Sequence, residues 1–247
     1  VEKPLCLNEE QMKEIIKTYH SLITNNDSQL SGNGMPLLMV GFNRRFSSAA
    51  RKAREFIGSN GPSSVVQIRC NAGFIPKDSW VHDPEEGGGR STGEVCHFVD
   101  VAQYLTGGAP KTVFAACCEN SQGTWDNVCV TMQMDNGAAV TITYASNGDK
   151  SFPREEVEVF AGGGVFVIHN FKNAEQVVGG KRRKWRSLGT DRGYRNELRE
   201  TVEAVKKGGP SPIDFRSLVA TTLTTFAIEE SIREGRSIEV KPDLFLS

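Results

Sequence analysis

The stretch that decides the fold class is 127–146, "NVCVTMQMDNGAAVTITYAS". It consists of two strand-like runs joined by Asn136 and Gly137, a dipeptide typical of tight β-hairpin turns. Consecutive strands joined by so short a turn pair antiparallel. The stretch therefore predicts an antiparallel hairpin.

Further strand-like runs lie on both sides of this hairpin. They are 63–74, 111–120, 155–162, 164–171 and 174–180. Helical patterns at 87–108, 194–209 and 215–235, and a short strand at 237–240, complete the region. The sequence thus predicts an α+β domain built on a mostly antiparallel sheet over 61–247.

The first 60 residues show a different pattern of predicted secondary structure. Asn8 and Gln11 form a capping-box pattern before an apolar period that predicts a helix to about Ile23. A polar loop at 24–34 and a buried strand at 35–42 are expected next. A helix then follows, capped by Ser47 or Ser48 and ended by Gly58. This alternation indicates the tail of an α/β layer with a parallel sheet.

Bulk properties exclude several classes of protein. The chain has 247 residues, 38% of them hydrophobic, and a net charge of −1. This composition argues against disorder and against a general attraction to nucleic acid or anionic membrane. No apolar run reaches the roughly 18 residues of a membrane span. The six cysteines form no CxxC pair, which is typical of reduced thiols in a cytoplasmic protein.

The helix around residues 90–106 carries the first candidate for chemistry. Glu94, His97 and Asp100 follow one another at intervals of three. A neutral imidazole flanked by carboxylates is a reasonable proton acceptor. The alternative is a solvated polar face with a structural histidine, and the spacing alone leaves both open. A single Glu-x-x-His gives no basis for a metal site, and none is expected.

Glycine and basic runs are the other candidates. No glycine group follows a strand as the dinucleotide fingerprint requires, so the phosphate loop is not in this chain. The basic run 179–187 is expected to be a solvated hairpin edge, with nucleic-acid binding as the lesser alternative. The loop 73–83, which contains Lys77 and Trp80, is either a surface loop or a wall of a substrate site.

Three motifs taken together carry a family resemblance. "EKP" (2–4), "GGGRSTGEVCHFVDV" (87–101) and "NELRETVEAVKKGGPSPID" (196–214) resemble the Gfo/Idh/MocA family of nicotinamide-dependent sugar and polyol oxidoreductases. The stretch 71–98 is most similar to the branch whose oxidoreductase unit is often fused behind a zinc-type alcohol dehydrogenase unit.

The resemblance implies a Rossmann domain followed by a substrate domain with an open, mostly antiparallel sheet like the C-terminal domain of glyceraldehyde-3-phosphate dehydrogenase. Residues 1–60 would then be the C-terminal remnant of the dinucleotide-binding domain. Residues 61–247 would be the substrate-binding and oligomerisation domain, with a homo-oligomer formed through the open sheet face.

The resemblance also assigns roles to residues. Lys3 and His97 match the family's catalytic lysine and histidine, which hold the reacting oxygen and exchange its proton. Glu2, Lys3 and Pro4 would face the cofactor, NAD or NADP. The residues expected to contact substrate are Lys77, Trp80, Glu94 and Arg45. Gly93 stands where many members carry an aspartate.

The function implied is oxidation or reduction at a hydroxyl carbon of a sugar, nucleotide-sugar or cyclitol. As a fragment of its parent enzyme, the chain is expected to be inactive alone. The alternative is a non-catalytic sugar-binding or assembly domain of a fusion protein, and the departure at Gly93 keeps that alternative open.

Overall fold

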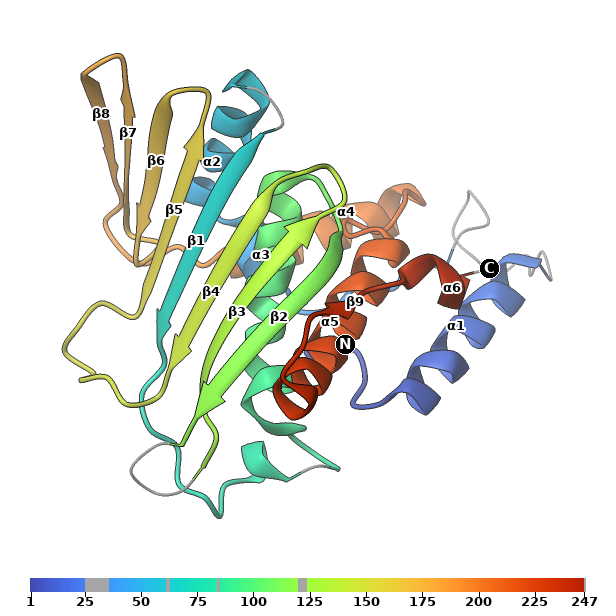
Figure 1. Cartoon of the computed structure of the whole chain (residues 1–247). Coiled ribbons are helices and arrows are strands. Elements are labelled where there is room, and N and C mark those ends of the chain that lie inside the picture. Colours follow the sequence, from blue (N-terminus) through green and yellow to red (C-terminus); the bar gives the residue numbers. More distant parts are fainter. Residues whose placement is uncertain (25–35, 61–62, 84, 120–123, 247) are drawn as a thin grey trace.

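A computed structural model describes residues 1–24, 36–60, 63–83, 85–119 and 124–246. At its centre lies a nine-stranded sheet with strand order β8-β7-β6-β5-β1-β4-β3-β2-β9 (Figure 1). The strands are β1 (Ser64–Asn71), β2 (Pro110–Cys118), β3 (Asn127–Met134), β4 (Ala139–Ala145), β5 (Glu155–Ala161), β6 (Gly164–His169), β7 (Asn173–Val178), β8 (Lys181–Arg186) and β9 (Ile238–Glu239). The helices are α1 (Glu9–Thr24), α2 (Ser48–Asn60), α3 (Cys96–Thr106), α4 (Tyr194–Lys207), α5 (Phe215–Glu234) and α6 (Pro242–Leu246).

Strand pairing is antiparallel except between β1 and β4, which run parallel. The hairpin at 127–146 forms as predicted: Gly137 has φ +88°, and the Met134 N–H donates to the Ala138 carbonyl at 2.9 Å. The basic run becomes the exposed edge strand β8, as expected. The prediction of a mostly antiparallel open sheet is confirmed.

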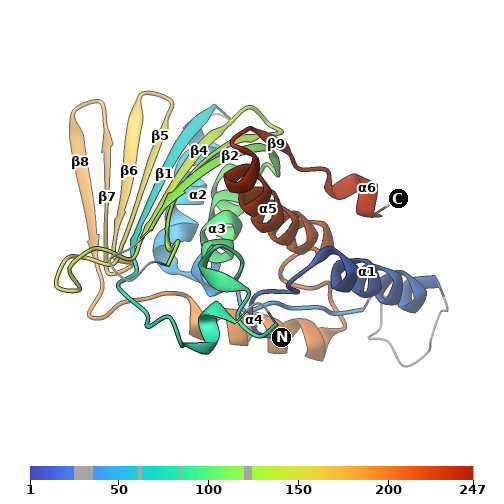
Figure 2. The same ribbon diagram turned by 60° about the horizontal axis from the view of Figure 1, so that its bottom comes forward.

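Helices cover one face of the sheet and leave the other open (Figures 1 and 2). Strand residues alternate accordingly, so that Val128, Val130 and Met132 of β3 are buried against the helices while the residues between them are exposed or half-buried. Helices α2, α3 and α5 supply the other side of this core. The opposite face of the sheet carries both apolar and polar side chains, and no layer of the described residues covers it.

The predicted strand at 35–42 is wrong for residues 36–42, the part of it that the structure describes. This segment has no strand assignment and buries Val40 and Phe42, and among the described residues its backbone bonds to other parts of the chain are those with Val1 and one from the Ser211 hydroxyl to the Leu38 carbonyl at 2.6 Å. The Val1 amino group donates to the Met39 carbonyl at 2.7 Å, and the Gly41 N–H donates to the Val1 carbonyl at 3.0 Å. An apolar segment becomes a β-strand only where a neighbouring strand offers a continuous series of backbone hydrogen bonds.

Two helix ends differ slightly from expectation. The Ser47 hydroxyl accepts from the Ala50 N–H at 3.1 Å and so is the predicted cap of α2. The helix continues past Gly58 to Asn60, because Gly58 does not adopt the left-handed conformation that ends helices. The predicted loop 24–34 lies outside the described residues except for Thr24, which ends α1.

No helix among the described residues is long and apolar enough to cross a membrane.

Candidate active site

The structure brings the N-terminal lysine to the start of the central helix. Lys3 Nζ donates to the Gly93 carbonyl at 2.6 Å and to Glu94 Oε1 at 2.5 Å. The Lys3–Pro4 peptide bond is cis. Two motifs about 90 residues apart in sequence therefore meet in space.

Residues Ser91–Val95, which present this lysine's partners, form a π-helical turn ahead of α3. Such turns occur often at functional sites because they displace side chains from the regular helical positions. A Cβ at Gly93 would lie 2.7 Å from the Gly87 carbonyl oxygen, so only glycine fits there. Thr92 donates from Oγ1 to Glu229 Oε1 of α5 at 2.9 Å. The turn is thus held from α5 while Glu94 faces Lys3.

His97 lies in the first turn of α3 and is 7% exposed. Its Nδ1 has no hydrogen-bond partner among the described residues, and the Phe42 ring packs edge-on against the imidazole with centroids 6.1 Å apart. Burial lowers the pKa of His97 well below its ordinary value, and the charges of Arg44, Lys3 and Arg154 lower it further. The imidazole is therefore neutral at physiological pH and able to accept a proton.

The predicted carboxylate partners of His97 are engaged elsewhere. Glu94 binds Lys3, and Asp100 binds Arg45 through Nε at 2.9 Å and Nη2 at 2.5 Å. The i, i+3 spacing failed as a guide because Glu94 lies in the π-helical turn and Asp100 points to the segment that precedes α2. The solvated polar face is also wrong, since Asp100 is fully buried.

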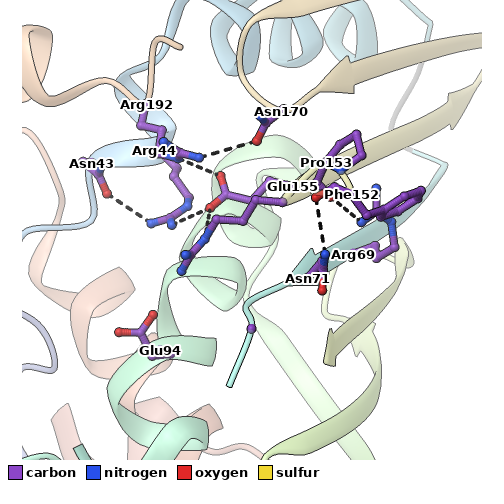
Figure 3. A network of polar contacts seen from close by, with 12 residues as sticks. Asn43, Arg44, Arg69, Asn71, Glu94, Phe152, Pro153, Glu155, Asn170 and Arg192 are labelled. Carbon is purple, nitrogen blue, oxygen red and sulfur yellow. Dashed lines mark hydrogen bonds and ion pairs between the residues drawn. The ribbon is translucent and has the colours of Figure 1, made fainter. Parts of the chain in front are cut away.

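A second charged cluster, which the sequence did not predict, lies beside this site (Figure 3). Glu155, at the start of β5, accepts from Arg44 Nη2 at 2.8 Å and from Arg192 Nε at 3.2 Å. Arg154 Nε lies 3.5 Å from the same carboxylate. We call Arg44, Arg154, Glu155 and Arg192 the Glu155 cluster.

The electrostatics of the Glu155 cluster favour the ionised carboxylate. Burial raises the pKa of Glu155, but the Arg44 and Arg192 guanidiniums outweigh it and hold the pKa below its usual range. One signal for the cluster was present in the sequence. Glu155 shares the inward register of Val157 and Val159 in the predicted strand, which places a carboxylate on the apolar face.

The remaining predicted residues are placed as follows. Trp80 is 64% exposed and Lys77 is exposed, and in the described part of the chain neither forms a hydrogen bond or ion pair with Lys3, Glu94 or His97. Arg45 is occupied by Asp100. Glu2 and Pro4 flank Lys3. The substrate and cofactor roles of these residues stay predictions.

No group of three or more histidine, cysteine or acidic side chains that could hold a metal ion is present in the described ranges. The lysine, the neutral imidazole and the neighbouring arginines suit a nicotinamide reaction, in which charge develops on a substrate oxygen. These residues fit the reacting end of such a cofactor.

The fold is similar to that of a known family of domains. Residues 50–167 match the family model described as the GFO/IDH/MocA C-terminal domain. The open mixed sheet of the chain has the fold of that domain.

Individual relatives resemble the chain over most of its length. The chain is 24% identical over 220 residues to myo-inositol 2-dehydrogenase of Thermotoga maritima, covering 83% of this chain and 65% of the relative. It is 24% identical to inositol 2-dehydrogenase of Rhizobium meliloti, covering 97% and 72%. An Agrobacterium radiobacter oxidoreductase, solved with NAD+, L-tartaric acid and magnesium, superposes with a TM-score of 0.74 at 16% identity, covering 97% and 72%. The chain thus spans less than two thirds of the Thermotoga relative.

Proposed function

We propose that the protein to which this chain belongs is an NAD- or NADP-dependent oxidoreductase that acts on a hydroxyl carbon of a sugar, nucleotide-sugar or cyclitol. The observation that carries the proposal is the hydrogen-bonded placement of Lys3 on the turn that leads into the buried, neutral His97. The curated relatives, both named as inositol dehydrogenases, support the same reaction class.

The two catalytic residues divide the work at the substrate hydroxyl. A bound nicotinamide would accept or supply the hydride at carbon. The His97 imidazole takes the hydroxyl proton during oxidation and returns it during reduction. An ammonium has three donors, and Lys3 uses two of them on Gly93 and Glu94. Its third N–H is free to hold the substrate oxygen as negative charge develops.

Glu94 takes over the role of the aspartate that Gly93 replaces. Because a side chain at residue 93 would meet the Gly87 carbonyl, the carboxylate comes from the next residue instead. It acts through Lys3, fixing the ammonium at 2.5 Å.

Residues 1–60 are proposed to belong to the nucleotide-binding domain, with Glu2, Lys3 and Pro4 facing the nicotinamide. Residues 1–247 alone should then bind the cofactor weakly. Titration of NADH and NADPH fluorescence tests this, and tight saturable binding would contradict it. The closer likeness to the branch fused to zinc-type alcohol dehydrogenase units stays a prediction.

The reaction is tested on the full-length product of the gene that encodes these residues. Purified protein is incubated with NAD or NADP and a panel of sugars and cyclitols, and formation of the reduced cofactor is followed by absorbance. We expect turnover with at least one substrate and its loss in His97→Ala. Turnover that survives this substitution would refute the assigned role.

A second candidate is a sugar-binding or assembly domain without catalysis, favoured by the open sheet face and the missing residue-93 carboxylate. The same face is where we expect a homo-oligomer to form. In this case His97→Ala would leave the protein's biological role intact. A monomeric mass by light scattering at micromolar concentration would contradict the oligomer.

A further inference from the structure

Buried polar atoms without hydrogen-bond partners gather at one end of the sheet. Six of the ten such atoms in the described residues belong to this group. They are Nδ2 of Asn43, Nε of Arg44, Nε and Nη1 of Arg90, Nδ1 of His97 and the hydroxyl of Tyr144. Folded proteins leave few such atoms unsatisfied, so a cluster of them points to a missing polar ligand.

Aromatic contacts show that these residues are neighbours. The Arg44 guanidinium lies 5.1 Å from the Phe98 ring centroid, and the Phe98 and Tyr144 centroids are 6.3 Å apart. The Arg90 guanidinium lies 5.0 Å from the Tyr144 centroid. The guanidiniums of Arg44 and Arg90 therefore lie beside the Phe98–Tyr144 pair. His97 is the residue before Phe98 in the sequence.

Arg90 is the most informative member. It is 4% exposed, and its Nη2 donates to the Gly73 carbonyl at 3.2 Å. Within the described ranges no carboxylate forms an ion pair with it, and Nε and Nη1 are unpartnered. A buried cation without a counter-charge is costly. The free edge of a guanidinium matches the two oxygens of a carboxylate or phosphate.

Positive charge exceeds negative charge around this group. The cations are Lys3, Arg44, Arg90, Arg154 and Arg192, and the carboxylates that bind them are Glu94 and Glu155. The whole chain carries a net charge of −1, so the local excess is not a general property of the protein. The Arg154 side chain is 43% exposed and that of Arg192 27%, so a ligand can reach the cluster from solvent.

The charges of these lysine and arginine side chains act on two neighbouring groups, the Tyr144 hydroxyl and the His97 imidazole. Burial raises the pKa of the Tyr144 hydroxyl, while the charges of Arg90 and Arg154 both act to lower it. The charges of Arg44, Lys3 and Arg154 all act on His97. A single small ligand could therefore meet both the proposed catalytic pair and the unpaired guanidinium.

We infer that the substrate of the proposed oxidoreductase is an anionic sugar or polyol derivative, whose carboxylate or phosphate is bound by Arg90 and Arg154 while its reacting hydroxyl faces Lys3 and His97. This inference rests on the proposed function. A neutral polyol would supply hydroxyl acceptors but would leave the buried charge of Arg90 uncompensated. An acid supplies both the acceptor oxygens and the counter-charge.

Isothermal titration calorimetry of the full chain at low salt tests the inference with four probes. These are galacturonate and glucose 6-phosphate as the anions, and galactose and glucose as their neutral counterparts. We expect each favoured anion to bind at least about tenfold more tightly than its counterpart, equivalent to about 1.4 kcal/mol. A preference for galacturonate over glucose 6-phosphate would identify a carboxylate subsite, and the reverse a phosphate subsite.

Variants locate the binding. Arg90→Gln and Arg154→Gln should each weaken anion binding about tenfold or more and leave neutral-sugar binding unchanged. Arg186→Gln, on the exposed edge strand β8, is the matched control and should change neither. If Arg90→Gln does not fold, the half-exposed Arg154 still decides the question.

Three results would overturn the inference. They are equal affinity for anion and neutral counterpart, anion binding that both variants leave unchanged, and no anion binding by chain with a native circular dichroism spectrum. Failure of the proposed function is a separate result. Full-length protein that binds the anion but never reduces NAD or NADP would keep the anion subsite and remove the reaction.

Discussion

The Glu155 cluster and the Lys3–Glu94 pair are both ion pairs, but they differ in burial and therefore in what they do. Both join the first 60 residues to the rest of the chain, through Arg44 in one case and Lys3 in the other. The Arg44 and Glu155 side chains are 7% and 0% exposed, whereas those of Lys3 and Glu94 are 20% and 24% exposed. Burial makes the first a structural connection, and partial exposure leaves the second available to a substrate.

The largest effect on stability is expected from Glu155→Ala. Removing this carboxylate leaves two buried or half-buried guanidiniums and Arg154 without their counter-ion, which should cost about 3–5 kcal/mol of unfolding free energy. Urea denaturation measures it. Glu158→Ala, on the same strand but facing the open side, is the control. A loss below about 1 kcal/mol for Glu155→Ala would contradict the structural role of the cluster.

At the site formed by Lys3, Glu94 and His97, the large effect should appear in activity. His97→Ala in the full-length protein should lower turnover by about 10²–10⁴-fold, because it removes the proton acceptor. Steady-state kinetics with the reacting sugar measures it, and urea denaturation of the same variant checks that it folds. Unchanged turnover would leave His97 as a core histidine only.

The turn that presents Glu94 should tolerate no side chain at residue 93. A Cβ there would lie 2.7 Å from the Gly87 carbonyl, so Gly93→Ala should destabilise by about 1–3 kcal/mol. Thermal unfolding measures this. Gly58→Ala is the matched control, since Gly58 is helical and its Cβ would meet no atom of the described residues within 4 Å. That substitution should stabilise by about 0.5–1 kcal/mol, and equal losses in both variants would refute the steric argument.

Lys3→Met should separate stability from function. A half-exposed ion pair contributes about 0–1 kcal/mol, so the unfolding free energy should change little while turnover falls. Lys13→Met, which breaks the exposed pair with Glu9, serves as control and should spare both. A large stability loss in Lys3→Met would make this pair structural, like the Glu155 cluster.

The smallest expected effect is a shift in pH dependence. Oxidation requires neutral His97, whose pKa burial, Arg44, Lys3 and Arg154 lower, so activity should persist below pH 6.5 and fall only at more acid pH. Arg154→Gln removes one of these charges and should move the acid limb of the rate profile to higher pH. An unmoved limb would show that another group controls it.

The lowered pKa of His97 also makes the stability of the fold depend on pH. The dependence is opposite to that of a histidine whose charged form stabilises the fold. Because the pKa of His97 is lower in the folded chain, the unfolded chain binds the proton more readily. The contribution to stability is complete above the unfolded pKa and declines as the pH falls below it. His97→Gln should therefore weaken the acid dependence of the unfolding free energy.

Local patterns predicted the sheet well and the site only in part. The Asn136–Gly137 turn, the edge strand β8 and the caps of the helices follow from neighbouring residues, so the sequence reveals them. The family resemblance assigned Lys3 and Glu94 to one site, but their ion pair was not predicted, because no local rule joins residues about 90 positions apart.

What could not be predicted depends on tertiary partners. The run at 36–42 has strand composition but no neighbouring strand in the described residues, and Asp100 binds Arg45 because the chain brings that arginine to α3. Glu155 with its three arginines is a further case. Its inward register was readable, but the identity of its partners was not.

The position of β1 has a consequence for the order in which the chain is synthesised. This strand lies between β5 and β4, so it joins the meander β2–β4 to the meander β5–β8, yet it precedes both in sequence. About 70 residues separate the end of β1 from the start of β4. At roughly 5–20 residues per second, β1 leaves the ribosome several seconds before its first partner. Protease protection of β1 in arrested nascent chains should therefore begin only after β4 has emerged.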